Sequence, residues 1–72
     1  MNTNQILIVA RKHVGNGAAM ESSARLCLAD AVNLYTDGDY AAAERRALRS
    51  LSYSVGILHA DYRKVLQTVV RA

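Results

Sequence analysis

The stretch LYTDGDYAAAE, from Leu34 to Glu44, holds the residues of a tight corner between two helices. Gly38 suits the position just after a helix end, because glycine adopts the left-handed backbone conformation without steric cost. Asp39 can accept hydrogen bonds from the backbone N–H groups that open the next helix. The stretch therefore predicts a helix that ends near Thr36, a short turn, and a second helix that begins at Asp39.

Upstream of this corner, apolar residues recur at three- and four-residue spacing, as expected for one side of an amphipathic helix over about residues 18–36. These residues are Met20, Ala24, Cys27, Leu28, Ala31, Leu34 and Tyr35. Leu26 and Ala29 fall on the opposite side of the same helix, so we expect a smaller apolar contact there. The first helix or a second subunit would fill it.

The segment before that helix is expected to form a helix over about residues 3–14. The polar residues from Asn2 to Asn4 can cap its start, and the stretch from Gly15 to Gly17 can supply the left-handed residue that ends it. The β-branched residues between Ile6 and Val9 are equally compatible with a short strand. Because no second strand can be recognised for it to pair with, the sequence favours the helix.

Downstream of the corner, one apolar stripe keeps helical phase almost to the C-terminus. It consists of Tyr40, Ala43, Ala47, Leu51, Val55, Leu58, Tyr62, Val65 and Val69. This continuity is compatible with a single helix that begins at Asp39. The alternative is a break near His59, with helices over about residues 39–58 and 61–71 and Asp61 as the cap of the last one. Gly56 supports a break, since glycine costs roughly 1 kcal/mol relative to alanine inside a helix.

Together these segments predict an all-α fold, in which residues 1–72 form one small antiparallel bundle of three helices, or four if the third one breaks. A chain of 72 residues buries only about 60% of the surface that its unfolded form exposes, so its stability margin is thin. We therefore expect it to form a homodimer or to associate with a larger partner.

Residues around the corner resemble the central part of a tetratricopeptide-type helical hairpin. They are Ala31, Leu34, Tyr35, Gly38, Asp39, Tyr40, Ala43 and Leu51. The chain departs from that motif at Ala47, where an aromatic residue is preferred, and at Ser50, where alanine is preferred. No second copy can be recognised, and such repeats usually need about three copies to bury a continuous core. The resemblance implies a lone hairpin with an added helix, and it implies protein binding rather than chemistry.

The composition points to a soluble protein of the cytoplasm. Cys27 is the only cysteine, so an intramolecular disulfide is excluded and a reducing compartment fits best. The longest apolar run, from Ile6 to Ala10, is far shorter than the ~20 residues that span a bilayer, so no membrane partner is expected. The formal net charge of +3 is a mild excess that favours anionic partners.

Residue types that support catalysis or metal binding are scattered along the chain. His13, Cys27 and His59 occur singly in three segments, without the CxxC or HxxxH spacing of a metal site. Asp37 and Asp39 are the one close pair of carboxylates, and both are accounted for as residues of the turn. The sequence therefore predicts no enzyme, no catalytic residue, no metal and no cofactor.

The candidate binding residues lie on the outer side of the third helix. They are Arg45, Arg49, Ser52, Tyr53, Gly56, Ile57 and Arg63, with Arg46 and Lys64 beside them. The simplest interpretation is a solvated basic face. A protein contact is the second interpretation, because arginine and tyrosine are enriched at interface hot spots and the small side chains of Ser52, Gly56 and Ala60 would let a partner approach closely. Phosphate binding is the third.

These features predict a small non-catalytic protein-interaction or accessory module. We expect an adaptor or an inhibitor, such as phages and mobile elements carry, that acts through its helix faces on a protein partner or on a second copy of itself. The alternative, from a different class, is a nucleic-acid-binding protein that uses the basic face of the third helix.

Overall fold

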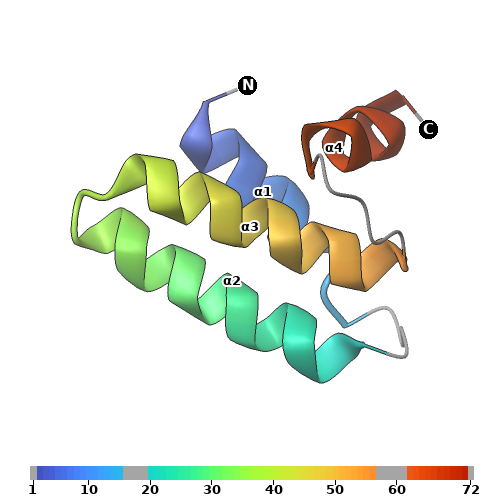
Figure 1. The fold of residues 1–72 in the computed structure, drawn as a ribbon, viewed down its shortest axis with the longest axis horizontal. Coiled ribbons are helices and arrows are strands. Elements are labelled where there is room, and N and C mark those ends of the chain that lie inside the picture. The colour runs from blue at the N-terminus through green and yellow to red at the C-terminus, as the bar shows by residue number, and fades with distance from the viewer. Residues whose placement is uncertain (1, 16–19, 57–61, 72) are drawn as a thin grey trace.

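The computed structural model describes residues 2–15, 20–56 and 62–71. This part of the chain is almost entirely helical and contains no strand, which confirms the predicted all-α fold. Its four helices, drawn in Figure 1, are α1 (Thr3–His13), α2 (Glu21–Thr36), α3 (Tyr40–Val55) and α4 (Tyr62–Arg71).

The corner between α2 and α3 is closed by local hydrogen bonds. Gly38 has a left-handed φ of 88°, and its N–H donates to the carbonyl of Tyr35 at 3.1 Å. The N–H of Asp39 donates to the carbonyl of Leu34 at 2.9 Å, which completes a Schellman ending of α2. The Asp39 carboxylate then accepts from the N–H of Ala42 at 3.3 Å and caps α3. Asp39 thus takes part in both the end of α2 and the start of α3.

A capping box opens α1. The side-chain oxygen of Asn2 accepts from the Gln5 N–H at 2.9 Å, and the Gln5 side chain accepts from the Asn2 N–H at 2.9 Å. Val14 follows the last helical residue and Gly15 has a φ of 94°. The segment around Ile6 is therefore helical, and the strand alternative for it is wrong.

The helix α3 lies at the centre of the fold and packs against each of the other three. In Figure 1, α2 and α3 run side by side in opposite directions, α1 lies across them, and α4 folds back on α3 near its C-terminal end. The apolar stripe predicted from Tyr40 to Val69 is therefore divided between α3 and α4, which pack against each other.

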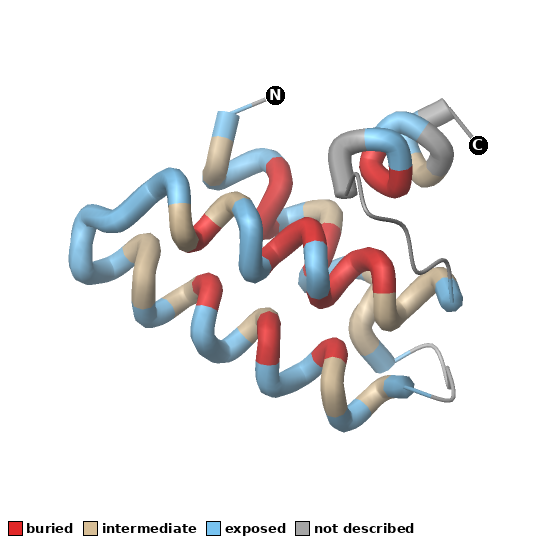
Figure 2. The backbone as a smooth tube through the Cα atoms, in the orientation of Figure 1, coloured by how far each residue is buried: buried red, intermediate tan, exposed pale blue. Residues whose placement is uncertain are grey.

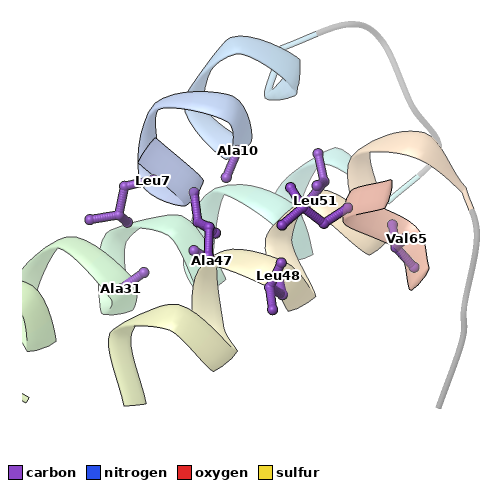
Figure 3. Packing of buried hydrophobic residues seen from close by; sticks show 9 residues of the cluster. Leu7, Ala10, Ala31, Ala47, Leu48, Leu51 and Val65 are labelled. Carbon is purple, nitrogen blue, oxygen red and sulfur yellow. The ribbon is translucent and has the colours of Figure 1, made fainter. Parts of the chain in front are cut away.

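The core lies where the four helices meet and is built from small and medium aliphatic side chains. Figure 2 shows the buried positions on the inward sides of the helices, and Figure 3 shows their side chains converging between α1, α2, α3 and α4. The cluster contains Ile6, Leu7, Ala10, Ala31, Ala47, Leu48, Leu51, Val65 and Leu66. Its three alanines let neighbouring helices approach closely, which compensates in part for the absence of larger apolar residues.

Buried serines lie within the packed surface of α3. The Ser50 hydroxyl donates to the carbonyl of Ala24 on α2 at 2.7 Å, and both residues are fully buried. This hydrogen bond accommodates a polar residue where the tetratricopeptide motif prefers alanine. The Ser54 hydroxyl oxygen is also buried, but it has no hydrogen-bond partner in the described part of the chain.

Of the two alternatives for the segment after the corner, one continuous helix or two helices, the structure has two, α3 and α4. The helix α3 ends at Val55, and Gly56 follows it with a left-handed φ of 74° and an N–H that donates to the Ser52 carbonyl. Gly56 is thus a helix-ending residue and not a tolerated glycine inside a helix. The helix α3 therefore ends three residues before the predicted bound at residue 58. His59 and Asp61, where the break and the cap of the last helix were predicted, lie outside the described residues.

Candidate functional site

A hollow between α2 and α3 is lined by three arginines of α3. Its volume is about 370 Å³, and the lining residues are Leu34 of α2 with Ala42, Arg45, Arg46 and Arg49 of α3. Leu34 and Ala42 are half-buried, whereas the three arginines are exposed. The hollow therefore combines an apolar wall with a cationic rim.

The arginines occupy this position because the rest of α3 is covered. The helix packs against three neighbours, and its buried residues occupy a broad arc of its circumference. A charged side chain is strongly disfavoured on this buried arc unless it is paired, so the arginines lie on the part of the helix that stays exposed. Ala42, Arg45, Arg46, Arg49 and the half-buried Tyr53 occupy the remaining arc.

The rim brings three permanent positive charges together, since a guanidinium group stays protonated in proteins. Arg45 and Arg49 are separated by four residues, so they are neighbours on the same side of α3. Arg25 on α2 forms an ion pair with Glu21 at 3.1 Å on the same helix. Arg49 also interacts within the chain, as does the half-buried Glu44.

The chemistry available at the rim is anion binding by guanidinium groups. Each group presents N–H donors in a planar fork that matches a carboxylate or a phosphate in a bidentate way. The backbone N–H groups of Arg45, Arg46 and Arg49 lie inside α3, where they take part in helical hydrogen bonds. Side chains alone are therefore the donors.

The structure places the sequence-predicted site residues in different surroundings. Arg45 and Arg49 line the hollow, and Tyr53 lies half-buried on the same arc of α3. Ile57 lies outside the described residues, and Arg63 belongs to α4, where only its backbone is described.

Two predicted positions on the outer side of α3 are wrong. Ser52 is 0% exposed, because it follows the core residue Leu48 by one turn on a side of α3 that the other helices cover. Gly56 ends the helix, so it does not form a groove of small residues with Ser52. Ala60, the third residue of that predicted groove, lies outside the described part.

Sequence reasoning missed the apolar wall of the hollow. Leu34 was expected in the core, and Ala42 had no predicted role. The signal for Ala42 was available, since it precedes Arg45 and Arg46 by three and four residues and so shares their side of the helix. The contribution of Leu34 depends on how α2 packs on α3, which no spacing along the sequence shows.

A second hollow, of about 340 Å³, lies beside the start of α1. It is lined by Asn2, Thr3, Asn4, Tyr35 and Tyr40, and the rings of the two tyrosines are tilted by 53° with their centres 5.0 Å apart. This contact joins α2 and α3 on either side of the corner. None of the described residues that line this hollow is charged, so the arginine hollow is the stronger candidate site.

In the three described segments, no group of three or more His, Cys, Asp or Glu residues is placed to hold a metal ion. None of the described helices is long and apolar enough to cross a membrane.

Comparison with protein-family models, with curated proteins and with solved structures found no match to this chain. The resemblance to a tetratricopeptide hairpin therefore rests on the corner residues alone.

Proposed function

We propose that this chain is a small non-catalytic protein-interaction module, of the adaptor or inhibitor type, that contacts its partner through the exposed arc of α3. The observation that carries this proposal is the gathering of Arg45, Arg46 and Arg49 around a hollow with an apolar wall. Interface hot spots have this anatomy, in which an apolar centre is bordered by polar residues and arginine is enriched.

The cost of the arrangement supports a binding role. Like charges four residues apart destabilise a helix by about 0.2–0.5 kcal/mol, and Arg45 and Arg49 have this spacing. Arg46 adds a third positive charge at the same hollow. Arg49 also interacts within the chain, and an anionic group of a partner would be attracted to the charges of Arg45 and Arg46 beside it.

The test compares two double variants that remove the same charge from different places. Arg45→Gln with Arg46→Gln changes the hollow, and Arg11→Gln with Lys12→Gln changes an exposed adjacent pair on α1. The wild-type chain and both variants would be used to capture partners from the native cell, after circular dichroism has shown equal helicity. We expect the first variant to lose a protein that the wild type and the second variant retain. An identical set of captured proteins for all three chains would refute the proposal.

Nucleic-acid binding is the second candidate, and the same three arginines support it. Binding through phosphates releases counterions, so the logarithm of affinity falls with the logarithm of salt concentration by about 0.9 for each phosphate on duplex DNA. Three arginine contacts would give a slope of about −2.7. If no labelled DNA or RNA is bound even at low salt, this candidate is removed.

Self-association and a cytoplasmic location belong to the same proposal. Leu26 is 70% exposed on the side of α2 that faces away from the core, so α1 does not fill the contact expected there. A second subunit would fill it. The lone and buried Cys27 is consistent with a reducing compartment.

A further inference from the structure

We infer that the hollow between α2 and α3 binds an acidic segment of a protein partner, with a Glu or Asp carboxylate between the arginines and an apolar side chain against the wall. This inference rests on the proposed function, since it names the chemistry of the partner that the exposed arc of α3 recognises. Its first basis is charge complementarity between Arg45, Arg46 and Arg49 and a carboxylate.

The donors at the hollow fit a carboxylate better than a phosphate. Phosphate sites in proteins commonly use backbone N–H groups at the start of a helix or in a nest. Arg45, Arg46 and Arg49 belong to the middle turns of α3, so the hollow lies away from the N-terminal end of that helix. The guanidinium fork itself holds a carboxylate or a phosphate, so the preference for a carboxylate rests on the position of the hollow away from the start of the helix.

The apolar wall of the hollow determines which type of partner side chain lies next to the bound carboxylate. Leu34 and Ala42 are half-buried and line the hollow together with the arginines. An aliphatic side chain on this wall would exclude water from the rim, and charge-assisted hydrogen bonds strengthen as the local dielectric falls. A segment in which acidic and aliphatic residues alternate supplies both groups, whereas a phosphodiester chain supplies only the charge.

The surroundings also disfavour a long polyanion. Exposed acidic residues lie within about one turn of the lining residues along the chain: Asp30 before Leu34 on α2, Asp37 after it, and Asp39 before Ala42. These carboxylates would repel the successive charges of an extended phosphate backbone more than the single carboxylate that the hollow would hold. In addition, none of the described residues that line the hollow is aromatic, so none of them offers a stacking platform to a nucleotide base.

The volume is compatible with this occupant. Sites for small ligands measure about 300–1,000 Å³, and the hollow lies near the lower end of that range at about 370 Å³. A site of this size accepts one acidic side chain together with an aliphatic neighbour. It does not enclose a folded partner, so the partner contributes a short segment.

The experiment titrates the intact chain, labelled with ¹⁵N, with three short capped peptides and follows the amide signals by NMR. The first peptide has Glu residues among Leu and Ser, the second has Gln in place of every Glu, and the third has Ser in place of every Leu. We expect the first peptide to shift signals of α3 and of Leu34, and we expect the other two to bind at least about tenfold more weakly.

Matched variants test whether the arginines of the hollow are responsible. Arg45→Gln with Arg46→Gln should weaken binding of the Glu peptide about tenfold or more, and Arg11→Gln with Lys12→Gln should leave it within about twofold. Arg49 is left unchanged because it interacts within the chain. Charge reversal at Arg45 and Arg46 to Glu should restore binding to a peptide that has Lys in place of Glu, which separates direct pairing from a change in fold.

Four results would overturn the inference. Equal binding of the Glu and Gln peptides would exclude carboxylate recognition, and equal loss in both double variants would exclude the hollow as the site. Tighter binding of a DNA oligonucleotide or of inorganic phosphate at the same signals would assign the hollow to phosphate. Absence of peptide binding, while partner capture still depends on Arg45 and Arg46, would refute the acidic segment and leave the proposed function standing. If partner capture is also unchanged in the Arg45 and Arg46 variant, both the inference and the proposed function are refuted.

Discussion

Alanine substitutions at Ser50 and Ser54 should change the stability of the fold in different ways, although both serines lie on α3 and are separated by one turn. The Ser50 hydroxyl donates to the carbonyl of Ala24 at 2.7 Å in the buried contact between α2 and α3. The Ser54 hydroxyl oxygen is buried without a hydrogen-bond partner in the described part of the chain. The same chemical change therefore removes a hydrogen bond at one site and an unsatisfied polar group at the other.

The size of the difference follows from these two environments. Loss of the hydrogen bond to Ala24 costs about 0.5–1.5 kcal/mol, since the carbonyl retains its helical partner. Removal of a buried hydroxyl that has no hydrogen-bond partner should raise the free energy of unfolding by roughly 1–3 kcal/mol. Alanine also has the higher helix propensity, by up to about 0.7 kcal/mol, and this gain is largely common to both variants. Ser54→Ala should therefore exceed Ser50→Ala in stability by at least about 1.5 kcal/mol.

Thermal and urea unfolding followed by circular dichroism would measure this difference. For a domain of this size 1 kcal/mol shifts the midpoint by about 4–8 °C, so the two midpoints should be separated by about 6–12 °C. Ser22→Ala, at an exposed position of α2, serves as the control and should stay within about 0.5 kcal/mol of the wild type. Equal stabilities of the two α3 variants, or a larger loss at Ser54, would refute the assignment of their partners.

Three further predictions follow from the packing and from the helix ends. Gly56→Ala should destabilise the fold by about 1–2 kcal/mol because φ is 74° there, and a gain in thermal midpoint would restore the mid-helix interpretation. Leu51→Ala should cost about 2–5 kcal/mol in urea unfolding because Leu51 is 0% exposed, and a loss below about 1 kcal/mol would contradict its place in the core. Leu26→Gln should lower the mass of any oligomer seen by light scattering, and an unchanged mass would exclude α2 as the contact between subunits.

The corner and the starts of α1 and α3 were predictable because their interactions are local. Gly38 and Asp39 act through hydrogen bonds to residues no more than five positions away, and the cap at Asn2 reaches only to Gln5. Such contacts depend on residue type and spacing, which the sequence contains in full. The spacing of apolar residues also predicted which face of α2 is buried. Ala24 is buried and Leu26 is exposed, as the helical periodicity indicated.

The end of α3 was not predictable from periodicity. Val55 and Tyr62 are seven residues apart, which is close to two helical turns, so the apolar stripe stays in phase whether or not the helix continues between them. The left-handed conformation of Gly56 ends α3, and the folding back of α4 places Val65 in the core. That choice depends on contacts between residues far apart in the chain, which periodicity does not contain.

The arginine hollow combines both kinds of information. The spacing of Arg45 and Arg49 on one side of a helix follows from the sequence, because a helix advances about 100° per residue. The burial of Ser52 depends on three helices packing around α3, and the placement of Leu34 beside the arginines depends on the contact between α2 and α3. The sequence by itself therefore determined which charges share one helix face. Only the tertiary structure decided which part of that face stays exposed and which apolar wall stands next to it, because packing between helices determines both.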